Sequence, residues 1–292
     1  MWNNFIGVIS ILFYITNTIF WAIPIILGSV LKLIPIKIWR TGVTHILDAC
    51  ATAWVTVNHL IQSLTSNTKW DVKGLQNLSS KDWYLVIANH QSWVDILVLQ
   101  RVFNRKIPFL KFFLKKELIW VPVLGLAWWA LDFPFMKRYK KDFLLKHPHL
   151  KGKDLETTRK ACEKFRYKPV SVMNFVEGTR WTAAKHKYQQ SRFQHLLMPR
   201  AGGIAFVLNS MGDHLHKLLD VTIHYPGGVP SFWDFICGKV KKINIDVKVL
   251  PIHPHLLGDY FDSAEQREKF QTWLNLLWQE KDRTLQQLSA QG

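Results

Sequence analysis

Residues 83–95, WYLVIANHQSWVD, decide the fold class of this chain. From Trp83 to Ala88 the residues are almost all aromatic, β-branched or aliphatic, which is typical of a short strand buried on both faces. Polar residues then end the run, and from Val94 to Phe103 the apolar positions recur on one helical face. The stretch therefore predicts a buried strand, a turn and a helix.

The same alternation of strands and helices continues toward the C-terminus. A polar helix is expected at about residues 154–166, and an amphipathic helix with Ser263 as its N-cap closes the chain. Strands separated by helices favour an α/β fold with a mainly parallel central sheet flanked by helices. The further strands are expected at Val170–Val176, Val221–Tyr225 and Ile243–Leu250, and the closing helix at Ser263–Leu288.

The N-terminal region has a different texture. The stretch from Phe5 to Leu31 carries no charged side chain and is longer than the ~20 residues that cross a bilayer as a helix. Lys32, Lys37 and Arg40 follow it, so the positive-inside rule places the remainder of the chain in the cytoplasm. A buried core helix is the alternative, whereas a signal peptide is disfavoured because the basic residues that should precede the apolar run are missing.

A second apolar stretch, Thr41–Leu64, has Asp48 as its only full charge. It can form the second membrane-embedded helix of a hairpin, or an amphipathic helix on the membrane interface. We expect a membrane-associated helical region at residues 1–68 and a separate domain at residues 69–292. The predicted location is the cytoplasmic (inner) membrane, with the second domain on its cytoplasmic face.

Composition points to an anionic partner. Lys and Arg number 38 against 21 Asp and Glu, a formal net charge of +17. Fourteen Trp and eighteen Phe favour membrane lipids, because amphipathic rings settle at the headgroup level. Nucleic acid is not expected as a partner, because the sequence has neither zinc-finger spacing nor an aromatic-glycine RNA-binding signature.

The first candidate site follows the first predicted strand. His90 stands where a strand ends and a helix begins, which is where reactive groups gather in open α/β sheets. An imidazole there can act as a general base, and Asp95 in the next helical turn can fix its tautomer and stabilise its cation. A histidine that caps the helix, with Asp95 serving the helix dipole, is the plainer interpretation.

The second candidate site follows another predicted strand, at Phe175-Val176-Glu177-Gly178-Thr179-Arg180. Gly178 permits a tight turn, and Arg180 offers a planar fork suited to a phosphate. Glu177 can hold a hydroxyl of the substrate or orient Arg180. The alternative is an ordinary turn with a surface ion pair.

A third element contains the pair Lys115-Lys116, then Pro122 and Gly125, and ends at Arg138. The tryptophan-rich run between its ends is too short and too interrupted for a confident membrane span. It suits a surface that dips into the interface and guides a lipid toward basic residues. The alternative is a core helix followed by a strand.

These three elements, in this order, resemble the motifs of the glycerolipid acyltransferase superfamily, especially its bacterial 1-acylglycerol-3-phosphate acyltransferases. The pattern N-H-x-x-x-x-D corresponds to Asn89, His90 and Asp95. The pattern F-P-E-G-T-R corresponds to Phe175–Arg180, with Val176 in place of the usual Pro. The Lys pair, Pro-x-x-Gly and strand-ending Arg correspond to Lys115, Lys116, Pro122, Gly125 and Arg138, and a looser fourth motif corresponds to Val221–Pro226.

The resemblance implies an O-acyltransferase of phospholipid biosynthesis that makes phosphatidic acid. An acyl group would pass from acyl-CoA or acyl carrier protein to the 2-hydroxyl of 1-acylglycerol 3-phosphate, with no cofactor and no metal. His90 would be the base and Asp95 its partner, while the acceptor site would include Lys115, Lys116, Arg138, Glu177, Gly178, Thr179 and Arg180. Another lysophospholipid, glycerol 3-phosphate or a lipid A-type precursor is the alternative acceptor, and a membrane-tethered basic binding protein is the non-enzymatic alternative.

Overall fold

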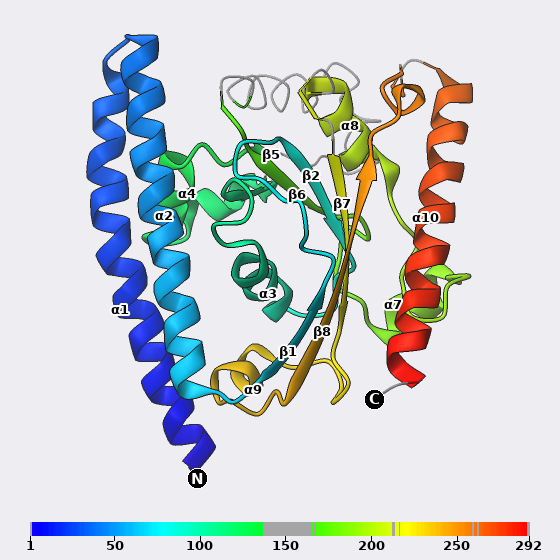
Figure 1. Cartoon of the computed structure of the whole chain (residues 1–292), viewed down its shortest axis with the longest axis horizontal. Coiled ribbons are helices and arrows are strands. Elements are labelled where there is room, and N and C mark those ends of the chain that lie inside the picture. The colour runs from blue at the N-terminus through cyan, green and yellow to red at the C-terminus, as the bar shows by residue number, and fades with distance from the viewer. Residues whose placement is uncertain are drawn as a thin grey trace.

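The computed structural model describes residues 2–136, 165, 168–211, 214–215, 217–258, 260–261 and 263–290. Three layers lie side by side (Figure 1): a pair of long antiparallel helices, an α/β domain built on one sheet, and a long C-terminal helix on the far side of that sheet. The helix expected at about residues 154–166 falls almost entirely outside the described residues.

The N-terminal hairpin consists of α1 (Trp2–Val30), a short 3-10 turn, η1 (Leu31–Leu33), and α2 (Lys37–Thr65). Its two helices are bound by polar side chains inside an otherwise apolar contact, because the Asn17 amide donates to Asn58 Oδ1 at 2.8 Å and the Trp54 indole donates to Thr18 Oγ1 at 3.1 Å. Of the described helices, one stretch, Trp2–Leu33, is long and apolar enough to cross a membrane. Helix α2, which contains the second apolar stretch, packs antiparallel along α1, so the two helices form the hairpin, one of the two predicted arrangements.

The central sheet confirms the predicted α/β class. Its strand order is β1-β8-β7-β2-β6-β3, and all neighbours are parallel except β7 and β8. All five residues of β2 are buried, and alternate side chains enter the two apolar cores on the two faces of the sheet. The strands are β1 (Lys69–Lys73), β2 (Tyr84–Ala88), β3 (Leu110–Phe112), β6 (Ser171–Phe175), β7 (Lys217–His224) and β8 (Lys242–Pro251).

Helices cover both faces of the sheet. The core on the hairpin side includes α3 and α9, and the core on the opposite side includes α8 and α10. A two-stranded parallel sheet pairs β4 with β5, and Leu114 of β4 packs against a third apolar cluster that the hairpin forms with α4. The remaining elements are α3 (Val94–Phe103), β4 (Leu114–Lys115), η2 (Lys116–Trp120), α4 (Leu124–Ala130), β5 (Phe135–Met136), α7 (Ala183–Gln189), α8 (Ala201–Met211), α9 (Phe232–Ile236), η5 (Pro254–Leu256) and α10 (Ala264–Ala290).

The predicted elements that flank the first candidate site are confirmed. Helix α3 spans the predicted residues, and the hydroxyl of Ser263 caps α10 by accepting from Gln266 N at 3.2 Å. Strand β7 begins at Lys217, four residues before the predicted start. The prediction began after Asp220 because a charged residue is unusual in a buried strand, but here the charge is buried in an ion pair with Lys281. The division into residues 1–68 and 69–292 stays a prediction, although α2 ends at Thr65 and β1 begins at Lys69.

Partly buried ion pairs join the hairpin to the α/β domain. Asp48 on α2 contacts the ammonium groups of Lys168 and, at 3.4 Å, Lys111. Lys32, in η1 between the two hairpin helices, binds the Asp132 carboxylate at 2.6 Å. A buried charge that loses its partner is costly, so these pairs fix the register of the hairpin against the domain.

Candidate active site

The imidazole of His90 is held at the C-terminal end of β2 by a fully buried carboxylate. Its Nδ1 lies 2.9 Å from Asp95 Oδ2, and because the carboxylate can only accept, the ring nitrogen donates. The same oxygen accepts from the backbone N–H groups of Gln91 at 2.6 Å and Ser92 at 2.8 Å. Asp95 Oδ1 accepts from the Tyr225 hydroxyl at 2.6 Å. The carboxylate is therefore fixed by four donors, which leaves Nε2 of His90 as the nitrogen available to a substrate.

Two further contacts fix the position of the imidazole. Its ring stacks on Phe175 with centroids 3.8 Å apart and planes 12° apart. The Asn89 side chain bonds both backbone groups of Ile223, at 2.8 and 2.9 Å, and so ties the end of β2 to β7. Burial raises the pKa of Tyr225 well above its ordinary value, with the Asp95 charge adding to the effect, so Tyr225 remains a hydroxyl donor.

The carboxylate of Glu177 points inward, onto backbone groups. Oε1 accepts from His90 N–H at 2.8 Å, and Oε2 accepts from Leu197 N–H at 3.0 Å. Burial raises the pKa of Glu177 to about 8, against the opposing effects of the two N–H donors and of the Lys281 ammonium. Glu177 thus joins the turn after β6 to the loop that carries His90.

The residues after Glu177 complete the turn. Gly178 has a φ of +69°, a conformation that favours glycine. The Lys185 ammonium donates to Thr179 Oγ1 at 2.8 Å and to the Arg180 carbonyl at 3.0 Å. The guanidinium of Arg180 lies over the ring of Trp93, 4.8 Å from its centroid, and the side chain is exposed. The next residue, Trp181, donates its N–H to the His90 carbonyl at 2.7 Å, so this turn lies beside the His90 loop.

The third predicted element is placed in part. Lys115, at the end of β4, lines the cavity described below, whereas Lys116, the first residue of η2, does not. Both side chains are exposed. Arg138 lies outside the described residues. The predicted acceptor residues that line the same cavity as His90 are therefore Lys115, Gly178, Thr179 and Arg180.

A cavity of about 840 Å³ extends from His90 between the hairpin and the sheet. His90, Lys115 and Arg180 are among its lining residues, and most of its wall is apolar. Both hairpin helices contribute to that wall, together with α4, β3 and β6. Representative apolar lining residues are Ile25, Ala51, Phe112, Leu124, Ala127 and Trp128. A reactive imidazole and a basic group thus open onto a space suited to a hydrocarbon chain.

The Acyltransferase family model matches residues 69–225, more than half of the chain, and these include His90, Asp95, Glu177, Arg180 and Tyr225. The chain belongs to the Acyltransferase family. The acyltransferase is also similar to the human 1-acyl-sn-glycerol-3-phosphate acyltransferase delta, with 25% identity over 215 residues, 69% of this chain and 52% of the relative. The mouse 1-acyl-sn-glycerol-3-phosphate acyltransferase epsilon is 26% identical over 228 residues, 70% of this chain and 58% of the relative.

The acyltransferase therefore spans about half the length of the curated relatives it matches. A solved structure covers it more fully. The crystal structure of the 1-acyl-sn-glycerophosphate acyltransferase from Thermotoga maritima superposes with a TM-score of 0.54 at 16% identity, over 98% of both chains. That likeness shows the fold, N-terminal helices included.

Sequence reasoning missed several residues of the acyltransferase site, among them Lys185, Leu197, Tyr225 and Arg200. Tyr225, which holds Asp95, stands next to Pro226 in the loosely matched fourth motif, so a signal for it existed. Arg200 carries no such signal. Its N–H bonds Val176 O at 2.9 Å, and its side chain lies 3.4 Å from where a Cβ on Gly178 would stand.

Proposed function

We propose that this acyltransferase moves a fatty acyl group from acyl-CoA or acyl carrier protein to the 2-hydroxyl of 1-acylglycerol 3-phosphate, which yields phosphatidic acid. One observation carries the proposal: the His90 imidazole, held through Nδ1 by Asp95, lines the same apolar cavity as Arg180. The names of the curated relatives agree with this acceptor.

The proposed chemistry follows from that geometry. Nε2 of His90 takes the proton of the acceptor hydroxyl as its oxygen attacks the thioester carbonyl. The tetrahedral intermediate then expels the thiolate, which receives the proton back from the imidazolium. Asp95 stabilises the imidazolium in between. The thioester is already activated, so the reaction requires neither an acyl-enzyme nor a metal or cofactor.

The acceptor phosphate would be bound by Arg180 and Lys115, the cations that line the cavity beside His90. Of the other predicted acceptor residues, Thr179 and Gly178 would shape this end of the cavity, and Lys116 and Arg138 would attract the anionic headgroup. Glu177 would position His90 instead of touching substrate, because both of its oxygens accept from backbone N–H groups. The apolar wall would hold an acyl chain.

We further propose that the hairpin lies in the plane of the membrane, within the cytoplasmic leaflet of the inner membrane. Near its start, α1 packs so closely on α9 that a Cβ on Gly7 would lie 2.4 Å from Cys237 Sγ. Just beyond its C-terminal end, Lys32 in η1 binds Asp132. A helix packed on the α/β domain at both ends can cross the bilayer only by drawing that domain into it. The exposed apolar face of α1 and the exposed Trp120 and Trp129 would contact lipid.

The test of function is a transfer assay with purified protein in detergent. Palmitoyl-CoA and palmitoyl acyl carrier protein would be offered with lysophosphatidic acid, other lysophospholipids, glycerol 3-phosphate and a lipid A precursor. The proposal expects phosphatidic acid from lysophosphatidic acid and a loss of at least about 100-fold in His90→Ala, since a positioned base contributes roughly 10²–10⁴-fold. Phosphatidic acid formed at the wild-type rate by His90→Ala would refute it.

A further inference from the structure

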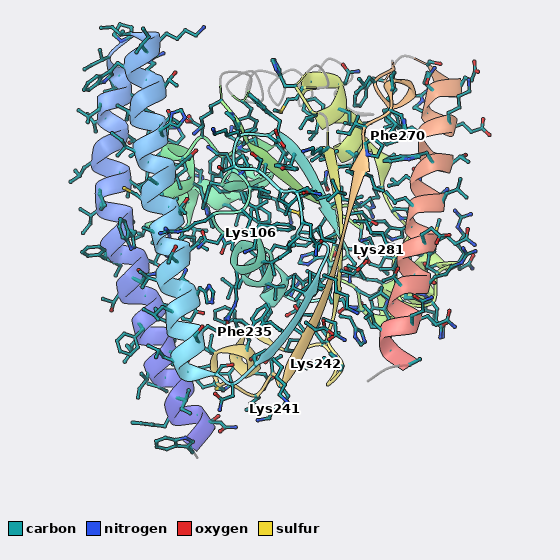
Figure 2. All side chains as sticks on the ribbon, viewed as in Figure 1. Lys106, Phe235, Lys241, Lys242, Phe270 and Lys281 are labelled. Atoms are coloured by element: carbon teal, nitrogen blue, oxygen red, sulfur yellow. The ribbon has the colours of Figure 1, made fainter. Side chains whose placement is uncertain are left out.

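Helix α10 follows the residues that the family model matches, and it lies against the face of the sheet opposite the cavity. It is anchored there by a fully buried lysine. Lys281 Nζ lies 2.6 Å from Asp220 Oδ1 and donates to the Val221 carbonyl at 2.6 Å. Figure 2 shows Lys281 on the side of α10 that faces the sheet. The rotation and height of α10 on the sheet are thereby fixed, since a misplaced helix would bury two unpaired charges.

The same helix holds the backbone of residues 194–199, the loop segment that leads into α8. Both oxygens of Asp282 accept from it, Oδ2 from Gln194 N–H and Oδ1 from His195 N–H, each at 2.8 Å. One turn earlier, the buried Trp278 indole donates to Leu197 O at 3.1 Å. Gln271 donates to Pro199 O at 3.3 Å. Three turns of α10 therefore form a template for an irregular segment that has few hydrogen bonds of its own.

This segment leads directly to the reacting group. Leu197 N–H donates to Glu177, and the other oxygen of Glu177 accepts from His90 N–H. An unbroken path of hydrogen bonds and peptide units thus runs from α10 to the backbone of the imidazole. The charges of Lys281 and Asp95 act on Glu177 from two sides, Lys281 from α10 and Asp95 from α3.

We propose that α10 positions His90 from the far face of the sheet, and that Asp282 is the residue through which it does so. The inference rests on the proposed role of His90 as the base. Asp282 touches no reacting atom, so it is a positioning residue. Its contribution is to keep residues 194–199 in place, so that Leu197 holds Glu177 and Glu177 holds the His90 loop.

The test compares Asp282→Ala with Glu280→Ala. Glu280 is also acidic and lies on the same helix. Its exposed carboxylate pairs with Arg283 alone among the described residues, a surface contact of little energetic weight. Hydrogen–deuterium exchange would be measured on peptides covering residues 84–95 and 190–200, alongside kcat and KM for both substrates. Exchange reports local opening whether or not the protein turns over substrate.

Asp282→Ala is expected to speed exchange at residues 194–197 and at His90 by about tenfold or more, and to lower kcat about tenfold without raising KM. Glu280→Ala should match the wild type in every measurement. Trp278→Phe removes the indole donor together with part of the buried ring. It should show the same pattern more weakly and serves if Asp282→Ala does not fold.

Fast exchange confined to residues 194–197, with His90 protected and kcat unchanged, would overturn the inference. So would equal behaviour of Asp282→Ala and Glu280→Ala. If the wild type forms no diacyl product, the proposed function fails, but the exchange at His90 still decides whether α10 controls that loop.

Discussion

Replacing Asp95 by asparagine isolates the charge of the carboxylate from its geometry. The oxygen of the new side chain can still accept from His90 Nδ1, Gln91 N–H and Ser92 N–H, and its amide can donate to the Tyr225 hydroxyl, which is free to rotate. The imidazole would keep its orientation and tautomer. What disappears is the attraction between the carboxylate and the imidazolium that the proposed mechanism forms during transfer.

The size of that attraction follows from the contact. Two unit charges about 4 Å apart interact by roughly 4 kcal/mol at an effective dielectric of about 20. Asp95 is fully buried and its oxygen lies 2.9 Å from the ring nitrogen, so solvent screens the pair little. A barrier higher by about 4 kcal/mol corresponds to a rate lower by about 10³-fold. We therefore expect kcat of Asp95→Asn to fall about 1000-fold with KM nearly unchanged.

The assay follows thiol release from palmitoyl-CoA in the presence of lysophosphatidic acid, with both substrates saturating. Tyr225→Phe is the matched control, because it removes one donor from the same carboxylate and keeps both its charge and its contact with His90. We expect it to lose about tenfold at most. If Asp95→Asn retained kcat within about tenfold of the wild type, the imidazolium would not be an intermediate state that Asp95 stabilises.

Three further predictions concern Glu177, Asp48 and the cavity. The pKa of Glu177 is about 8 in the folded chain, and 4.5 is its ordinary value, so its contribution to stability is fully present below pH 4.5 and is lost as pH rises to about 8. This loss, on the order of 5 kcal/mol, should make the unfolding free energy depend more steeply on pH in the wild type than in Glu177→Gln. Equal slopes would contradict the prediction. Asp48→Asn leaves the buried ammonium groups of Lys111 and Lys168 without their shared anion, so the unfolding free energy should drop by about 3 kcal/mol; an unchanged denaturation midpoint would show that the ion pairs do not fix the hairpin. Ala127→Phe narrows the cavity at its apolar wall, so kcat/KM should fall for palmitoyl-CoA and much less for octanoyl-CoA. An equal loss for both donors would mean that the acyl chain binds elsewhere.

The parts of the fold that could be predicted from sequence are those with a strong local pattern. A strand buried on both faces, such as Tyr84–Ala88, is apolar at every position. A capped helix such as Ala264–Ala290 has apolar residues every three or four positions in an otherwise polar sequence, for example Phe270, Leu274 and Trp278. Strand β1 was missed because it is polar and only partly buried, so its pairing with β8 depends on the tertiary fold. Helix α8 was missed because its sequence is mostly apolar, without a charged face, and because two consecutive glycines near its start disfavour a helix.

The candidate site divides in a similar way. The pairing of His90 with Asp95 follows from their spacing across a strand end, and so was accessible to sequence reasoning. The partners of Glu177 were not, because its two donors are the backbone N–H groups of His90 and Leu197, and backbone groups leave no trace in a residue pattern. Asp282, 105 positions after Glu177 in the chain, contacts the intervening loop only because α10 packs across the sheet.

The hairpin has two apolar surfaces, one that lines the cavity and one that faces away from the α/β domain. On α1, Ala22 and Ile25 line the interior space, while Leu12, Phe20 and Leu27 face outward. The outer residues can therefore be exchanged for Glu, Lys and Gln with the lining untouched. We expect this variant, with a polar outer surface on α1, to stay in solution without detergent and to accept short-chain substrates dispersed in water. Its activity would show whether the reaction requires the bilayer or only the two helices.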